Sequence, residues 1–141
     1  MLIESYLEKP YWVIDILPKQ VPTNSRGQYF AIERHFLEHP RIDAIYQRFA
    51  DILLKLNCYE DFDVSSDGEK WLTNPEPKVL EAMVSKCMFQ LSMLYIILPT
   101  ADAMITLSGG DTNMTVYNPS DTTLELLRPI VSSEGLFIWK P

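Results

Sequence analysis

The stretch that decides the fold runs from Pro75 to Leu98 and has the sequence PEPKVLEAMVSKCMFQLSMLYIIL. Its first part places apolar residues three and four positions apart, as in a helix with one buried face. From Phe89 onward the opposite face becomes apolar as well, because it carries Met93 and Ile97. A helix that is apolar on all sides lies inside a fold. We therefore predict a central helix near residues 75–98, with a sheet on one side and other helices on the other.

The segments before this stretch predict a strand and two helices. Residues 11–17 are rich in β-branched and aromatic residues and are bounded by prolines, so they predict a mostly buried strand in which Asp15 is the exception. Residues 28–39 predict a short helix that ends at Pro40. Residues 41–57 carry the clearest amphipathic pattern in the chain and predict a second helix. A short helical arm is expected before the strand, and a loop after it at residues 18–27.

The segments around and after the central stretch predict a weak strand, a hairpin, a helix and a last strand. The weak strand is residues 58–64, and the hairpin pairs residues 103–107 with 114–117. The last helix starts at Asp121 and is kinked or shortened at Pro129, and residues 136–139 form the last strand. This order favours an α+β fold, with a mainly antiparallel sheet of four or five strands packed against about four helices. A three-layer α/β arrangement is the alternative.

Length and composition describe one folded domain. The 141 residues are 47% apolar and 22% charged, the balance of an ordinary globular chain, so residues 1–141 are treated as a single domain. The net charge of -7 disfavours nucleic acids and membranes as partners, because both attract basic surfaces. Cys58 and Cys87 are too few for a disulfide framework.

The same composition bears on the compartment. Glu4 and Glu8 stand where an export signal would carry positive charge. The most apolar window, residues 87–98, contains two polar residues and ends at Pro99, so it is too short to span a bilayer. We therefore expect a cytoplasmic protein.

The most specific motif is His35-Phe36-Leu37-Glu38-His39, which resembles the H-x-x-E-H pattern of the inverzincin metalloproteases. The resemblance covers these five residues and implies a zinc ion held by His35 and His39, with Glu38 as the general base. Helical angles place His35 and Glu38 on the polar side of the predicted helix, and the following proline places His39 at its end. We favour a solvated helix end and keep a small metal-dependent hydrolase as the alternative function.

A second metal-like pattern is formed by Asp63, Ser65 and Asp67 with Gly68, which resemble the first half of an EF-hand calcium loop. The twelfth position of such a loop needs a bidentate glutamate, and here it is Asn74. A polar turn is the simpler interpretation. The sequence therefore predicts neither a metal nor another cofactor.

Charge is distributed unevenly along the chain. No Lys or Arg lies between residues 86 and 128, and this interval contains four carboxylates, at Asp102, Asp111, Asp121 and Glu125. Clustered carboxylates steer a basic partner toward themselves and raise its association rate. We therefore predict a non-catalytic protein that binds a basic protein through these four residues, as a nuclease inhibitor or toxin-neutralising protein would. The alternative is that the acids only keep the domain soluble.

Overall fold

The computed structural model describes residues 2–24 and 27–141. Within them the chain forms five helices and seven strands, in the order α1 (Leu2–Leu7), β1 (Tyr11–Asp15), α2 (Tyr29–Phe36), α3 (Arg41–Asn57), β2 (Asp63–Ser65), β3 (Leu72–Thr73), α4 (Pro77–Gln90), β4 (Met93–Leu98), β5 (Ala103–Ser108), β6 (Asn113–Tyr117), α5 (Asp121–Ser133) and β7 (Phe137–Trp139). The part of the predicted loop at residues 25–26 lies outside the described residues.

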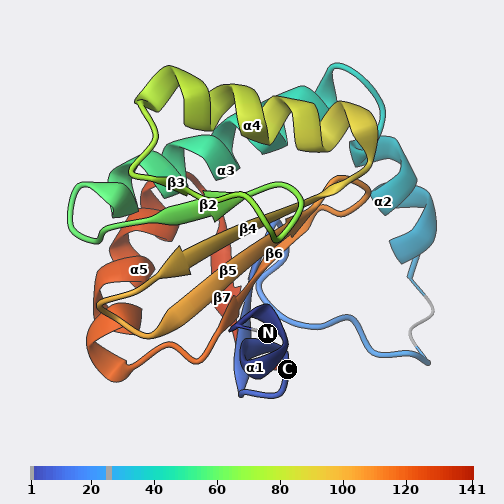
Figure 1. Cartoon of the computed structure of the whole chain (residues 1–141). Coiled ribbons are helices and arrows are strands. Elements are labelled where there is room, and N and C mark those ends of the chain that lie inside the picture. The colour runs from blue at the N-terminus through green and yellow to red at the C-terminus, as the bar shows by residue number, and fades with distance from the viewer. Residues whose placement is uncertain (1, 25–26) are drawn as a thin grey trace.

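The strands form one sheet with the order β3-β2-β4-β5-β6-β1-β7, and every neighbouring pair is antiparallel (Figure 1). Strand β1 lies between β6 and β7, so an N-terminal strand is held on both sides by C-terminal ones. The predicted α+β class with an antiparallel sheet is confirmed, and the three-layer α/β alternative is wrong. The predicted strand number was too low, because β3 has only two residues and β4 had been assigned to a helix.

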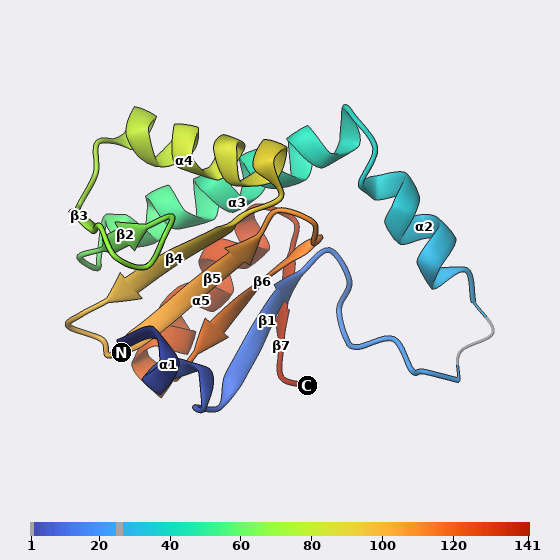
Figure 2. The same cartoon turned by 45° about the vertical axis from the view of Figure 1, so that its right-hand side comes forward.

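Helices α3, α4 and α5 cover one face of the sheet (Figures 1 and 2). Helix α3 contacts both α4 and α5 and buries eight of its residues, so it is the central helix of this layer. Its bounds are those that the apolar spacing predicted. Helix α1 lies on the other face, where Tyr6 packs against Ile97 and Met104.

The predicted central helix is in fact two elements. Helix α4 ends at Gln90, Leu91 adopts a left-handed backbone with φ of 50°, and the N–H of Ser92 donates to the carbonyl oxygen of Cys87 over 3.1 Å. This is a Schellman-type helix end, which turns the chain back toward the sheet as β4. Strand β4 is apolar on both faces because the helix layer covers one face and α1 the other, so it shows no alternation of period two.

Two boundaries in the helices differ from their predictions for local reasons. Helix α4 begins at Pro77 with Glu76 as its N-cap residue, and not at residue 75, while the side-chain oxygen of the preceding Asn74 accepts the N–H of Phe62 over 2.8 Å. Helix α2 ends at Phe36 and not at residue 39, and His39, the residue directly before a proline, is the position at which the helical region is disfavoured. Helix α5 begins at Asp121, and the hydroxyl of its N-cap residue Ser120 accepts the N–H of Thr123.

The main core is one cluster of buried residues. Ile14, Phe49, Leu53 and Cys87 are buried in it, and Met83 packs against it. Leu91, which lies within the stretch predicted as a buried central helix, is 73% exposed, because it follows the end of α4. No helix within residues 2–24 and 27–141 combines the length and the apolar content that crossing a membrane requires.

Candidate functional site

Four elements that are distant in sequence meet at one end of the sheet. They are the end of β1, helix α2, the C-terminal end of α4 and the hairpin loop between β5 and β6 (Figures 1 and 2). Helix α2 projects from the body and has no buried residue, although Phe36 and Leu37 at its C-terminal end pack against the core. Tyr29 of this helix lines a pocket together with Asp15 and Asn113 at this end of the sheet.

Three carboxylates from three of these elements lie here, and the charge of one of them, Glu33, acts on each of the other two. They are Asp15 at the end of β1, Glu33 on α2 and Asp111 in the hairpin loop. Burial raises the pKa of Asp15, which is 7% exposed, and the negative charge of Glu33 raises it further, while the N–H groups of residues 16 and 17 and the indole of Trp139 act in the opposite direction. Partial burial, and then Glu33, raises the pKa of Asp111, which remains accessible to solvent.

Tyr29 lies among these carboxylates. Its hydroxyl donates to Oε2 of Glu33 over 2.7 Å. Burial and the negative charges of Glu33, Asp15 and Asp111 raise the pKa of Tyr29 to about 12. None of the three carboxylates forms an ion pair with a residue in the described part of the chain. Within residues 2–24 and 27–141, their negative charge therefore has no ion-pair partner.

A pocket of about 230 Å³ opens beside Asp15. Its lining combines two aromatic residues, Tyr29 and Trp139, with the polar side chains of Lys19 and Asn113. The indole N–H of Trp139 donates to the carbonyl oxygen of Leu17 over 3.1 Å, which fixes the last strand against the start of the loop. A concave site with a few converging polar groups and a buried carboxylate is the usual form of a binding site.

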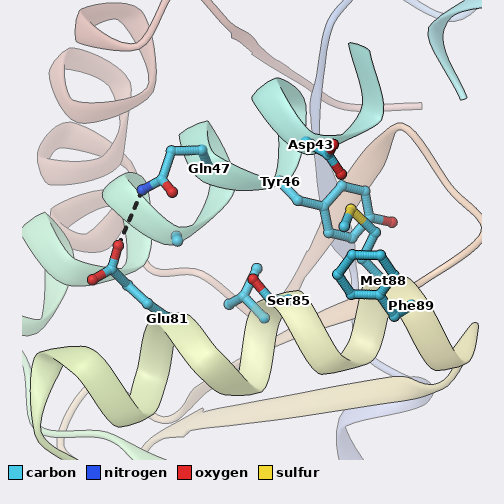
Figure 3. A pocket seen from close by; sticks show the side chains of 9 residues that line it. Asp43, Tyr46, Gln47, Glu81, Ser85, Met88 and Phe89 are labelled. Carbon is cyan, nitrogen blue, oxygen red and sulfur yellow. Dashed lines mark hydrogen bonds between the residues drawn. The ribbon is translucent and has the colours of Figure 1, made fainter. Parts of the chain in front are cut away.

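A second cavity, of about 220 Å³, lies between α3 and α4 (Figure 3). Its floor is apolar and is formed by Tyr46, Ala50, Val84 and Met88. Its rim is polar and is formed by Asp43, Gln47, Glu81 and Ser85, with Phe89 at the C-terminal end of α4. The amide of Gln47 donates to Oε2 of Glu81 over 3.1 Å and links the two helices across the groove.

Tyr46 connects this groove to the hairpin loop. Its ring lines the groove, and its hydroxyl lies 2.7 Å from the carbonyl oxygens of both Ser108 and Asp111, to which it can donate its one proton. Burial raises the pKa of Tyr46 well above its ordinary value. The hydroxyl therefore stays protonated and holds the loop that carries Asp111.

Gly109 holds the same loop against α4. A Cβ at this position would lie 2.1 Å from the carbonyl oxygen of Cys87, so only glycine permits the approach. The N–H of Gly109 also donates to the carbonyl oxygen of Ser92 over 2.9 Å. The hairpin loop, α3 and α4 thus form one rigid end of the molecule.

The H-x-x-E-H residues are not arranged as a metal site in the described residues. His35 lies on α2, 3.9 Å from Glu38, whereas His39 lies beyond the helix with its Nδ1 2.9 Å from Oδ1 of Asp43. No three His, Cys, Asp or Glu side chains are placed to hold one metal ion within residues 2–24 and 27–141. The structure therefore brings no third ligand to either histidine.

The residues of the EF-hand-like stretch form strand β2 and the bend that follows it at residues 66–70. Asp63 on β2 accepts the hydroxyl of Thr73 over 2.7 Å. Oδ1 of Asp67 accepts the hydroxyl of Ser65 and the N–H groups of residues 69 and 70, and these N–H groups lower its pKa to about 2. Asp63 and Asp67 thus accept hydrogen bonds from other residues of the chain, which agrees with the polar-turn interpretation.

The four carboxylates of the acidic interval are divided between two ends of the sheet. Asp111 follows β5, while Asp102 precedes it, so a strand of roughly 20 Å separates them. Asp121 and Glu125 lie at the start of α5, which follows β6 on the same side as Asp102. Asp102 accepts the hydroxyl of Tyr6 over 2.8 Å. Sequence reasoning joined residues that the fold separates, and it missed Glu33.

The two ends also differ in what surrounds them. The end with Asp111 combines carboxylates from separate elements with the two cavities described above. Comparison of the chain with known protein families, curated proteins and solved structures gave no match. The assignment of a function therefore depends on the geometry of this end.

Proposed function

We propose that the protein is a non-catalytic binding protein that engages a basic protein partner at the end of the sheet formed by Asp15, Glu33 and Asp111. The observation that supports this most directly is that three carboxylates from separate elements converge without an ion pair in the described part of the chain. Like charges brought together and partly desolvated cost free energy. A Lys or Arg side chain of a partner would offset that cost.

Such an arrangement acts on association before contact is made. Charges of one sign near low-dielectric walls produce a potential that attracts the opposite charge, and salt weakens this attraction. The effect appears mainly in the association rate and in partner selection. Of the residues predicted from the sequence, Asp111 belongs to the proposed surface, and Asp102, Asp121 and Glu125 do not.

The first test uses short peptides that differ only in charge. The isotopically labelled protein is titrated with a Lys- and Arg-containing peptide, a neutral one and an acidic one, and amide chemical shifts are followed. We expect only the basic peptide to bind, with shifts concentrated at residues 15, 33 and 111 and affinity that falls with added salt. Absence of binding by the basic peptide, or shifts concentrated near residues 102 and 121, would contradict the proposal.

The chain offers a matched control for net charge. The double variant Glu33→Gln with Asp111→Asn removes two carboxylates from the proposed surface, and Asp121→Asn with Glu125→Gln removes two from the other end. We expect the first to slow association and flatten its salt dependence, and the second to behave like the unmodified protein. Equal slowing in both variants would mean that only the net charge matters, and the proposed surface would be wrong.

A further inference from the structure

The C-terminal tip of α4 exposes two large apolar side chains. Phe89 is 70% exposed and Leu91 is 73% exposed, and Phe89 also lines the end of the groove between α3 and α4 (Figure 3). We call these two residues the α4 tip. Scattered apolar residues on a surface are ordinary, but a pair beside an apolar groove is typical of an interaction site.

Leu91 occupies an unfavourable backbone conformation. The other non-glycine residues with positive φ in the described chain are Asn74, Asp102 and Asn118, whose short polar side chains tolerate that region. Leucine does not, and glycine is the usual residue at this position of a helix end. Retaining an exposed leucine at an energetic cost indicates that its side chain has a use.

Neighbouring residues contact the backbone of Leu91 and the ring of Phe89 in the α4 tip. The hairpin residue Gly109 packs against the backbone of Leu91, with an added Cβ lying 2.8 Å from its Cα. His39 stacks on Phe89, with ring centroids 5.8 Å apart and planes inclined by 11°. Nδ1 of His39 is also hydrogen-bonded to Oδ1 of Asp43. A ring that already stacks on a neighbour, as that of Phe89 does on His39, loses less entropy on binding, which favours affinity.

The charges around the α4 tip define the partner. Asp43 and Glu81 lie on the rim of the groove, and Asp111 lies two residues after Gly109 in the adjoining loop. The C-terminal end of α4 adds the negative end of its helix dipole. A second copy of this chain, with its net charge of -7, would bring more negative charge to this surface. A basic segment of a different protein is complementary to it.

We infer that the α4 tip and the adjoining groove dock a basic amphipathic segment of the partner protein. A bulky apolar side chain of that segment enters the groove beside Phe89, and its Lys or Arg side chains face Asp43 and Glu81. The cavity of about 220 Å³ is larger than the roughly 150 Å³ that admits a benzene-sized group. This inference rests on the proposed function, since it names how the basic partner is held.

The test compares two synthetic peptides by calorimetry. The first is a helical peptide with leucines on one face and lysines on the other, and the second has the same lysines with serine in place of each leucine. We expect the leucine peptide to bind about tenfold more tightly than the serine peptide. Phe89→Ala and Leu91→Gly should each remove about that factor for the leucine peptide alone.

Tyr59→Ala is the matched control, because Tyr59 is also 70% exposed but follows the C-terminal end of α3. It should leave both affinities unchanged. Leu91→Gly should melt no lower than the unmodified protein, so lost binding cannot be attributed to unfolding.

The outcomes separate this inference from the proposal beneath it. If both peptides bind equally and the α4-tip variants bind as the unmodified protein does, the inference is wrong while charge-based binding stands. If neither peptide binds, the proposed function fails with it. If sedimentation shows a dimer that Phe89→Ala dissociates, a second copy occupies the surface and the inference is overturned.

Discussion

Asp15 is a carboxylate that folding buries without a neutralising partner among the described residues. Burial, and then the charge of Glu33, raises its pKa, against the opposing effect of hydrogen bonds from Leu17, Ile16 and Trp139. The native state therefore holds the Asp15 proton more tightly than the unfolded chain does. Between the unfolded and the folded pKa, stability falls as the pH rises, and above the folded pKa the whole penalty is present.

Asp15→Asn should therefore raise the melting temperature at pH 7. Asparagine keeps an oxygen that can accept the same N–H groups, but it carries no charge to desolvate. The advantage should shrink as the pH is lowered and disappear below about pH 3.9, where the unfolded carboxylate is protonated as well. Thermal unfolding from pH 3 to pH 7 measures this, and a variant less stable at pH 7 would show that the hydrogen bonds to the charged form outweigh burial.

Leu91→Gly should increase the free energy of unfolding by up to about 1.5 kcal/mol. Removing a side chain from the left-handed region recovers about 1–2 kcal/mol, from which the greater freedom of glycine in the unfolded chain subtracts about 0.5–1 kcal/mol. Leu91→Ala is the control, because alanine keeps the strained backbone and should give no such increase. Urea unfolding distinguishes the two, and equal stabilities for both variants would argue against strain at Leu91.

The sequence shows some of these residues more clearly than others. Asp15 stands out as the one acid in an apolar strand, and that signal correctly indicated an unusual position. Glu33 carries no such signal, because only the packing of α2 beside the sheet makes it part of the site. Phe89 and Leu91 were assigned to a buried helix, so their exposure could not be foreseen.

At the scale of elements, prediction succeeded where amphipathic spacing and capping agreed. Helix α3 shows an unbroken apolar face, and α5 has a serine cap, so both were placed well. Prediction was wrong where α4 ends and β4 begins, because it continued one helix through both. A six-residue apolar run that is buried on both faces has no period to distinguish strand from helix, and no glycine marks the end of α4.

Phe49 tests the central place of α3 in the helix layer. Its side chain is 0% exposed and packs in the main core cluster. Phe49→Ala should reduce the free energy of unfolding by about 3–5 kcal/mol, because it removes buried apolar contacts and leaves a cavity. Urea unfolding provides the measurement. A loss below about 1 kcal/mol would mean that α3 does not pack between α4 and α5 as described.

At the scale of the whole molecule, strand order decides which acids act together. Strand β1 pairs with β6, and this brings Asp15 opposite Asn113 at the sheet end that carries the hairpin loop. That pairing joins residues almost a hundred positions apart, so no local pattern could reveal it. The interval without cations suggested one acidic surface, but the antiparallel path of β5 and β6 sends its carboxylates to opposite ends.

The carboxylates at Asp15, Glu33 and Asp111 should make the melting temperature depend on the salt concentration. The chain has 19 acidic and 12 basic residues, so repulsion between carboxylates outweighs attraction between opposite charges. Raising the salt concentration from about 0.01 M to about 0.15 M shortens the screening length from about 30 Å to about 8 Å. We expect the melting temperature to rise, by about 3–4 °C for each kcal/mol of repulsion that is screened in a domain of this size.

The two double variants locate the origin of that rise. Glu33→Gln with Asp111→Asn should reduce it, because these variants remove two members of the group that includes Asp15. Asp121→Asn with Glu125→Gln changes the net charge equally but leaves that group intact, so its rise should be at least that of the unmodified protein. Asp121 lies in the first turn of α5, where the helix dipole favours it, and it therefore contributes little repulsion. Thermal unfolding at the two salt concentrations measures the rise in melting temperature for each variant. If both double variants reduce this rise equally, the repulsion comes from the net charge and not from this end of the sheet.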